Sequence, residues 1–242
     1  MKNSMKKKSP LISIIMNCRN GERFLKNSLK SILNQTYKSW ELIFWDNKST
    51  DKSYQILSKI KDKRIKYFLA KKITSLYKAR NLAIAKAKGQ YICFLDVDDW
   101  WAKNKLSTQV NLIKQKKGTN FVYSNFYIYN QSNGRKKIRS TKKLPSGKIT
   151  QFLLNDYKLG ILTVMLKKNY FKSKKFNYRY NIIGDFDFFI NLSLTENFYY
   201  IKKPLAYYRI HKDNYSKNTL SYSRELNQWL LKNSKKLLAK NY

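Results

Sequence analysis

The first hundred residues alternate between short apolar runs and longer amphipathic stretches, and this alternation restricts the fold more than any other feature of the sequence. The runs LISIIM, ELIFWDN, RIKYFLA and YICFLDVDD have the length and composition of strands buried on both faces. Between the first two, apolar residues such as Leu25, Leu29 and Ile32 recur three and four positions apart, which predicts a helix. Repeated strand–helix alternation predicts an α/β fold with a mostly parallel, doubly wound sheet.

The later part of the chain carries a weaker pattern. An Ala-rich helix closed by Gly89 is predicted over 75–89, a further helix over 102–116, and a single strand over 121–130. A basic loop follows over 133–147. The tail over 223–242 is predicted as a basic amphipathic helix. The apolar residues near one face of this helix are Leu226, Trp229, Leu230, Leu237 and Leu238.

Polar residues follow three of the predicted strands at their carboxyl ends. They form the segments Cys18 to Asn20, Asp46 to Asn47, and 96–99. In a doubly wound sheet, ligands bind in the crevice beyond the carboxyl ends of the strands. We therefore expect these three segments to line one crevice.

Three carboxylates, Asp96, Asp98 and Asp99, occupy four consecutive positions in a chain with 51 Lys plus Arg and only 14 Asp plus Glu. Neighbouring carboxylates repel one another unless a cation lies among them. Side chains two positions apart share a face of a strand, so we expect Asp96 and Asp98 to hold Mg²⁺ or Mn²⁺ that bridges to substrate phosphates. Asp99 then turns toward a ribose or into the next helix. The alternative, a cap on a helix that begins near Trp101, accounts for one carboxylate of the three.

The formal net charge of +37 admits three interpretations. Lysine is spread along the chain with many Asn, Ile and Tyr residues, which is typical of compositional drift on solvated surfaces. A nucleic-acid binder usually gathers its cations on one face, so nucleic acid is the less favoured partner. Attraction to an anionic membrane is the third interpretation.

The two cysteines, Cys18 and Cys93, lie in apolar surroundings and offer neither a disulfide framework nor a CxxC metal site, which favours a reducing cytoplasm. The basic N-terminal segment 1–10 precedes an apolar run that is too short for a signal peptide. No apolar run approaches the roughly 20 residues needed to span a bilayer. We expect a cytoplasmic protein, either soluble or peripheral on the inner face of the plasma membrane.

The stretches ISIIMNCRNGERFLKNSLKSILNQTYKSWELIFWDNKSTD and ARNLAIAKAKGQYICFLDVDDWW resemble the N-terminal half of the family 2 glycosyltransferases, which have the GT-A fold. Three motifs occur in the family's order, a far more specific match than a DxD motif alone. The resemblance implies a Rossmann-like, mostly parallel sheet flanked by helices, with a C-terminal acceptor-side region and a helical tail. It also implies a nucleoside-diphosphate sugar donor, a divalent metal, and inverting transfer to an acceptor hydroxyl.

By resemblance, one set of residues binds the nucleotide sugar. Cys18, Asn20 and Asp46 face the nucleobase and ribose, and Arg80 faces the nucleotide. The carboxylates that follow the fourth strand bind the ribose and the metal-bound diphosphate. These residues are Cys18, Asn20, Asp46, Arg80, Asp96, Asp98 and Asp99. Asn17 stands where the family commonly has proline, so the shape of the nucleobase loop is expected to differ.

The stretch YNIIGDFDFFINLS resembles the family's segment that carries the general base, often a Glu-Asp pair. Asp185 matches the Asp, and Gly184 stands where Glu is usual. A carboxylate suits a reaction in which an acceptor hydroxyl loses its proton as it attacks the anomeric carbon, and partial burial raises its pKa toward the working range. Asp187 is the alternative base or an acceptor contact. Asp185 is equally suited to cap a helix that begins at Phe186.

Two further residues receive roles from the resemblance. His211, the only histidine, lies in a stretch similar to the family's YRxH and is expected to reach the metal or the diphosphate, although an isolated histidine is more often a packed residue. Thr163 lies in GILTVMLKKNYF, which resembles the acceptor-side wall, where it either touches the acceptor or is a buried strand residue.

The resemblance places the donor-binding half at 11–115 and the acceptor and catalytic half of the same domain at 116–215, followed by the tail helix at 216–242. The expected reaction is metal-dependent transfer from a UDP-sugar to a lipid-linked glycan of the cell envelope, such as lipopolysaccharide or capsule. Two other functions stay open. One is a basic nucleic-acid-binding protein without activity, whose binding would weaken steeply with salt. The other is a degenerate transferase that binds donor without turnover.

Overall fold

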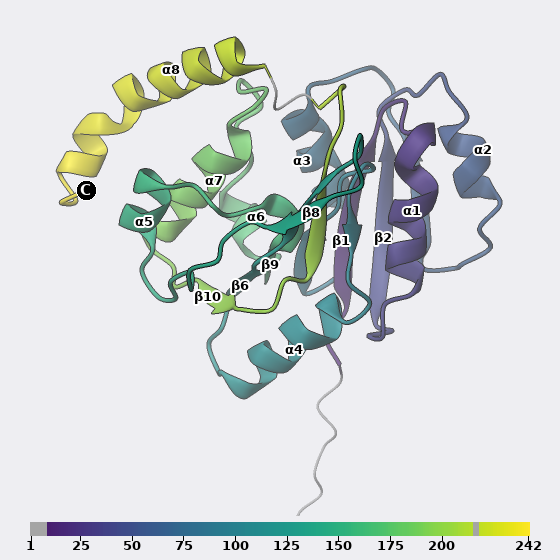
Figure 1. Ribbon diagram of the computed structural model, residues 1–242, viewed down its shortest axis with the longest axis horizontal. Helices are drawn as coiled ribbons and strands as arrows, with labels where there is room; N and C mark the ends of the chain where they lie inside the picture. The colour runs from purple at the N-terminus through teal and green to yellow at the C-terminus, as the bar shows by residue number, and fades with distance from the viewer. Residues whose placement is uncertain (1–8, 215–217) are drawn as a thin grey trace, which may run out of the picture.

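The computed structural model describes residues 9–214 and 218–242, so most of the predicted basic segment 1–10 lies outside the described residues. At its centre is a seven-stranded sheet, in which one strand, β9, runs antiparallel to both of its neighbours while the other pairs are parallel (Figure 1). In the order in which they pair, the strands are β10 (Tyr199–Ile201), β6 (Phe121–Ser124), β9 (Met165–Lys167), β4 (Tyr91–Phe94), β1 (Ile12–Cys18), β2 (Trp40–Asp46) and β3 (Ile65–Leu69).

The donor-side half follows the predicted alternation. The four strands expected from the apolar runs are adjacent and parallel in the order β4-β1-β2-β3. Each parallel connection is made by a helix, as a doubly wound sheet requires. The helices are α1 (Glu22–Leu33), α2 (Ser53–Ser58) and α3 (Leu76–Lys86). The predicted mostly parallel α/β sheet is therefore confirmed.

Two apolar cores lie on opposite faces of this sheet because successive side chains of a strand point to opposite sides. Ile12 and Ile14 of β1 belong to the core that includes α1 and α4 (Lys105–Gln115). Ile15 belongs to the other core, with α3 and α7 (Gly184–Ser193). Burial on both faces explains why the strands read as continuous apolar runs instead of alternating patterns.

A second, four-stranded sheet lies beside the first. It is made of β5 (Trp100–Trp101), β11 (Ala206–Ile210), β7 (Tyr127–Asn130) and β8 (Lys136–Ile138), paired in that order. β5 follows directly after the acidic segment 96–99, and β11 pairs with β5. This pairing brings the chain around residue 211 to the acidic segment, although more than a hundred positions separate the two in the sequence.

The single strand predicted over 121–130 is wrong: the structure has two strands, β6 and β7, in different sheets. The chain turns at Asn125, whose Oδ1 accepts hydrogen bonds from the N–H groups of Phe126 (3.0 Å) and Ser140 (3.3 Å). Its Nδ2 donates to the carbonyl of Ser140 (2.7 Å). A side chain that satisfies several backbone groups stabilises a turn. Residues 133–147, predicted as a basic loop, include the short strand β8.

The helix predicted to close at Gly89 ends earlier, at Lys86. Gly89 is needed for a different reason, because a Cβ there would lie 2.6 Å from both the backbone nitrogen and the Oγ of Ser13. Its N–H donates to Ser13 Oγ at 2.7 Å. Glycine is therefore required by the close approach to β1, and not by a left-handed helix cap.

Within the described residues, the C-terminal half adds three short helices on the α3 face of the sheet, a 3-10 turn whose Leu162 belongs to the opposite core, and one long helix beyond them. The shorter elements are α5 (Thr150–Asn155), η1 (Ile161–Thr163), α6 (Tyr170–Ser173) and α7, and the long helix is α8 (Thr219–Leu238). α8 lies along α7, on the side of the molecule away from α1 and α2 (Figure 1). None of the helices described is both long and apolar enough to cross a membrane.

Candidate active site

A pocket of about 370 Å³ opens at the carboxyl ends of β1 and β2, where the sequence predicts a ligand crevice. Two of the predicted segments contribute to it directly, through Cys18 and Asn47. The start of α3 and Asn181 form the rest of its wall. Burial raises the pKa of the Cys18 thiol, which therefore serves as a neutral lining group. Nδ2 of Asn17, at the position where the family commonly has proline, is buried without a hydrogen-bond partner among the described residues.

Two of the predicted donor-binding residues shape the loops of this pocket. Asp46 is buried, with Oδ1 accepting from the N–H of Ser49 (2.7 Å) and Oδ2 from the Tyr67 hydroxyl (3.0 Å). Asn20 is exposed, has φ of 55° and accepts from the N–H of Thr50 (2.8 Å). Both side chains thus bind the loop after β2, so the structure gives them partners within the protein.

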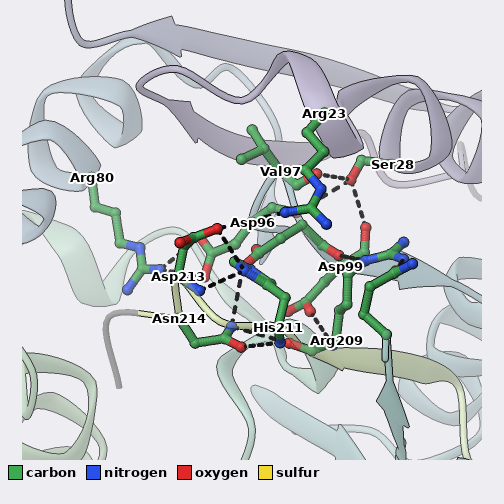
Figure 2. A network of polar contacts seen from close by, with 12 residues as sticks. Arg23, Ser28, Arg80, Asp96, Val97, Asp99, Arg209, His211, Asp213 and Asn214 are labelled. Carbon is green, nitrogen blue, oxygen red and sulfur yellow. Dashed lines mark hydrogen bonds and ion pairs between the residues drawn. The ribbon is translucent and has the colours of Figure 1, made fainter. Parts of the chain in front are cut away.

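The three neighbouring carboxylates after β4 each have a different partner, which answers how a basic protein tolerates them. Asp96 pairs with Arg80, whose Nη2 lies 2.7 and 2.8 Å from its two oxygens. Asp98 Oδ2 lies 3.1 Å from His211 Nε2. In Figure 2, Arg80 approaches the segment from α3, while His211 approaches from the chain that follows β11.

Arg80 is buried, with only 3% of its side chain exposed. Burial alone would lower the pKa of its guanidinium, but the charge and hydrogen bond of Asp96, together with Tyr77 and Asp185, outweigh this, so the pKa lies above its ordinary value and the arginine is a permanent cation. The Arg80 charge also lowers the pKa of Asp185, which comes from α7. One buried cation therefore pairs with the acidic segment and also contacts Tyr77, whose hydroxyl reaches the predicted base.

The surroundings of Asp98 disfavour its ionised form. Burial raises its pKa first and the charge of Asp96 raises it further, while the hydrogen bond with His211 acts in the opposite direction. The Asp213 N–H donates to Nδ1 of His211 at 3.2 Å, so the neutral imidazole carries its proton on Nε2 and donates to Asp98. The packed-residue alternative for His211 agrees with this geometry, while its predicted contact with a metal or diphosphate stays a prediction.

Asp99 is the one carboxylate of the three that turns inward. It is 3% exposed, and its Oδ1 accepts from the backbone N–H of Arg209 in β11 at 2.8 Å. Burial raises its pKa well above the usual range. Ser28 of α1 donates to the backbone oxygen of Asp99 (2.5 Å) and contacts that of Val97 (2.8 Å). Asp99 therefore turns aside from the other two carboxylates, as predicted, and binds β11, while its predicted role in donor binding stays a prediction.

The donor set suits a metal shared with a ligand better than a metal held by protein alone. Within residues 9–214 and 218–242, no group of three or more His, Cys, Asp or Glu side chains is placed to hold a metal ion. Asp96 and Asp98 nevertheless keep 33% and 24% of their side chains exposed. Magnesium often takes only one or two protein carboxylates and completes its shell with water and substrate phosphates.

Asp185 lies in the first turn of α7, between two tyrosine hydroxyls. Tyr157 donates to its Oδ2 at 3.4 Å, and the Tyr77 hydroxyl lies 3.1 Å from its Oδ1, sharing its single proton between this oxygen and the Ile182 carbonyl at 2.7 Å. Burial raises its pKa, while Arg80, the Phe186 N–H and Tyr77 act to lower it. The helix begins at Gly184 and has no side-chain cap, so the predicted capping role of Asp185 is wrong. A carboxylate with a raised pKa, fixed by two hydroxyls, is suited to accept a proton.

Gly184 is explained by the tyrosine ring beside it. A Cβ at this position would lie 2.5 Å from Cδ2 and Cε2 of Tyr77. The Tyr77 ring is 2% exposed and cannot move aside into solvent. The chain therefore has an aromatic ring where a side chain at position 184 would lie, and the ring's hydroxyl reaches Asp185.

Gly184→Ala is expected to destabilise the fold by about 1 to 3 kcal/mol, although alanine has the better helix propensity, because overpacking against a buried ring outweighs that gain. Thermal unfolding of the single variant and of the Tyr77→Ala/Gly184→Ala pair measures the effect. The smaller residue at 77 should cancel the penalty specific to the methyl group. An increase in stability for Gly184→Ala alone would contradict the packing argument.

The two predicted acceptor contacts have structural partners. Thr163 is fully buried and donates to the carbonyl of Gly160 at 2.7 Å, so the predicted burial is correct, although the residue lies in the 3-10 turn η1 and not in a strand. Asp187 accepts from Trp229 Nε1 (2.8 Å) and Asn191 Nδ2 (3.0 Å). It joins α7 to α8.

Several residues of the site had no predicted role. Tyr77 and Tyr157 approach Asp185 from positions 108 and 28 residues away, which no local pattern reveals. Glu225 had a detectable signal, since an acidic residue in a strongly basic tail is unusual in a chain with only four glutamates. Its carboxylate accepts hydrogen bonds from the backbone just before α7.

Comparisons with known proteins agree with this geometry. A profile of glycosyl transferase family 2 matches residues 13–192. An uncharacterized glycosyltransferase of Haemophilus influenzae is 34% identical over 215 residues, covering 86% of this chain and 83% of the relative. The Escherichia coli protein WfgD, a UDP-Glc:α-D-GlcNAc-diphosphoundecaprenol β-1,3-glucosyltransferase, is 35% identical over 65% of this chain and 60% of its own length.

A solved structure shares the fold. S. aureus TarS, crystallised in complex with UDP-GlcNAc, superposes with a TM-score of 0.72 at 20% identity, covering 86% of this chain and 60% of that chain. This likeness supports the GT-A fold that the strand order and the sequence motifs predict. With the family profile covering both the acidic segment and the chain around Asp185, the protein belongs to glycosyl transferase family 2.

Proposed function

We propose that the protein transfers a sugar from a nucleoside-diphosphate sugar, most simply a UDP-sugar, to a hydroxyl of an envelope glycan, with inversion at the anomeric carbon. The observation that carries the proposal is the position of Arg80, which binds Asp96 and lies 5.3 Å from the centre of the Tyr77 ring, whose hydroxyl contacts Asp185. Donor-side and base-side carboxylates thus share one buried cation. The names of WfgD and TarS, with their UDP-linked sugars, support the choice of nucleotide.

In this proposal, the pocket beside Cys18 and Asn181 holds the nucleotide, and the diphosphate lies toward Asp98. Asp98 and Asp96 would hold Mg²⁺ or Mn²⁺ together with the diphosphate, and His211 supports Asp98 through Nε2. A divalent ion there would stabilise the charge of the departing nucleoside diphosphate. Asp185 accepts the proton of the acceptor hydroxyl as this attacks from the opposite face of the sugar.

A panel of nucleotide sugars tests the proposal. The wild-type protein with Mn²⁺ should release the nucleoside diphosphate from one donor faster than from the others, and omission of the metal should suppress release. Absence of turnover with metal-dependent nucleotide protection in a melting assay would instead support the degenerate transferase. Absence of both would contradict the proposal.

The acceptor is proposed to be lipid-linked, and α8 to contact an anionic membrane surface. Leu220, Leu231 and Leu238 are 72%, 83% and 70% exposed. Their spacings of eleven and seven residues return to the same side of a helix, and basic residues including Lys235 and Lys236 belong to the same helix. WfgD, whose named acceptor is a diphosphoundecaprenol, supports this choice.

Replacing Leu220, Leu231 and Leu238 together with Ser is expected to weaken sedimentation with phosphatidylglycerol vesicles by at least about tenfold, because three apolar side chains no longer enter the interface. Leu69→Ser, at an exposed position on β3, is the control and should leave sedimentation unchanged. Point substitutions are sharper than deletion from Ser223 onward, which would also remove the buried Glu225 and Trp229. Unchanged sedimentation of the triple variant would exclude this face as the contact.

A further inference from the structure

The carboxylate of Glu225, in α8, binds the chain that leads into α7. Its Oε1 accepts from the N–H of Asn181 at 2.7 Å, and its Oε2 accepts from the N–H groups of Ile182 (2.9 Å) and Ile183 (3.1 Å). Glu225 is only 8% exposed. A charged acceptor with three backbone donors in a buried position makes strong hydrogen bonds.

These N–H groups belong to the residues just before α7, which begins at Gly184. The start of a helix leaves several N–H groups unsatisfied and carries a partial positive charge, so it favours a carboxylate. Neither α7 nor its N-cap residue Ile183 supplies a side-chain cap. Glu225, from a different helix more than forty positions later in the sequence, supplies the acceptor for the N–H of the N-cap residue Ile183 and of the two residues before it.

The same short segment is held from its other side by α3. The Tyr77 hydroxyl donates to the carbonyl of Ile182 at 2.7 Å. Ile182 therefore has its N–H bound by α8 and its C=O bound by α3. Asn181 also lines the pocket at the ends of β1 and β2, and Asp185 follows two residues after Ile183.

Two more contacts fix α8 along α7. Trp229 is 1% exposed and donates to Asp187, and Lys236 Nζ donates to Asn191 Oδ1 at 2.8 Å. The profile of the family ends at residue 192, so α8 lies outside the matched region. α8 nonetheless contacts both the first turn of α7, at Asp187, and a later turn of α7, at Asn191.

We propose that Glu225 is a positioning residue, through which α8 sets the place of Asp185 and of the pocket wall at Asn181. The proposal rests on the proposed function, in which Asp185 accepts the acceptor's proton. Glu225 itself touches neither substrate; it acts through the backbone of 181–183. The C-terminal helix is then part of the catalytic architecture as well as a surface element.

Glu225→Gln is the informative variant because it keeps the size of the side chain. The amide retains one acceptor oxygen, and its NH₂ group faces a backbone N–H that it cannot bind. We expect kcat to fall at least about tenfold, and amide hydrogen exchange over 181–185 to accelerate by a similar factor. Glu225→Ala should lower kcat further and accelerate exchange over 181–185 further, whereas Glu225→Asp should recover part of kcat.

Glu41→Gln is a matched control. Glu41 is also buried, at 6% exposure, and its Oε1 accepts from the backbone N–H groups of Lys88 (2.5 Å) and Gly89 (3.2 Å). It lies near the start of β2, at the opposite edge of the sheet from the site. Its substitution removes a buried charge elsewhere in the protein and should leave kcat and exchange over 181–185 unchanged.

Each outcome decides the proposal. Unchanged exchange over 181–185 in Glu225→Gln would overturn it, and so would faster exchange accompanied by a wild-type kcat. If the wild-type protein transferred no sugar from any donor, the proposed function would fail, whereas the exchange experiment would still decide whether Glu225 holds 181–185.

Discussion

Asp185→Asn is expected to lower sugar transfer by about 10² to 10⁴-fold, the range that a positioned general base contributes. Asparagine has nearly the same shape and can still accept a hydrogen bond from Tyr77, whose hydroxyl lies 3.1 Å from Oδ1 in the wild type. It cannot take up the proton of the acceptor hydroxyl. Steady-state kinetics with the best donor measures the change, and donor KM should change far less than kcat.

The same variant should not lose stability at neutral pH. Burial raises the pKa of Asp185 in the folded protein above its unfolded value. Such a group stabilises the fold at pH values below its unfolded pKa, and this contribution is lost as the pH rises through the folded pKa. Above that window the ionised wild-type side chain is the costly one, so the melting temperature of Asp185→Asn at pH 8 should equal or exceed that of the wild type.

Asp62→Asn is the control, with the opposite expected sign. Asp62 pairs with Arg64 at 2.6 Å, and hydrogen bonding to Arg64 lowers its pKa. Its stabilising contribution is present above the unfolded pKa, so the variant should lose a little stability and keep full transfer. Wild-type transfer in Asp185→Asn would remove this residue from the reaction and direct attention to Asp187.

Arg80→Met should have the second largest effect, because it acts on both stability and activity. Removal of one partner of a buried ion pair costs about 3 to 5 kcal/mol. Asp96 is 33% exposed and regains some hydration, so we expect a loss of about 2 to 3 kcal/mol in the free energy of unfolding. Transfer should fall as well, since two carboxylates lose their shared cation.

Arg64→Met provides the comparison for this experiment. Its pair with Asp62 is more exposed, at 33% and 19%, and should contribute less than about 1 kcal/mol. Urea unfolding of both variants gives the two losses on one scale. Equal losses at the two sites would contradict the burial argument for Arg80.

The donor-side fold could be predicted from the sequence because its signals are local. β1, β2 and β4 are continuous apolar runs, and the polar residues that follow them must gather at one edge of a parallel sheet. The acidic segment could be recognised for the same reason. Which group each carboxylate binds could not, since Arg80 comes from α3, whereas the Arg209 N–H and the His211 ring come from β11 and the chain directly after it.

The acceptor side was less predictable because its contacts are between distant parts of the chain. Gly184 departs from the family pattern, and only the structure shows the reason: the Tyr77 ring occupies the space where a side chain would lie. The tail has helical periodicity, but periodicity does not tell that Glu225 and Trp229 face inward while Leu231 is 83% exposed. Asp187 and Asp185 look equivalent in the sequence, and only their partners, Trp229 and two tyrosines, separate them.

Calorimetric titration of UDP and GDP into the wild-type protein and Asp98→Asn, each with and without Mn²⁺, tests the central claim most directly. The account predicts that one nucleotide binds the wild type at least about tenfold more tightly with Mn²⁺ than without it, and that Asp98→Asn abolishes this dependence. Binding of equal strength without metal, or a dependence that survives Asp98→Asn, would show that these carboxylates do not hold the donor's diphosphate through a divalent ion.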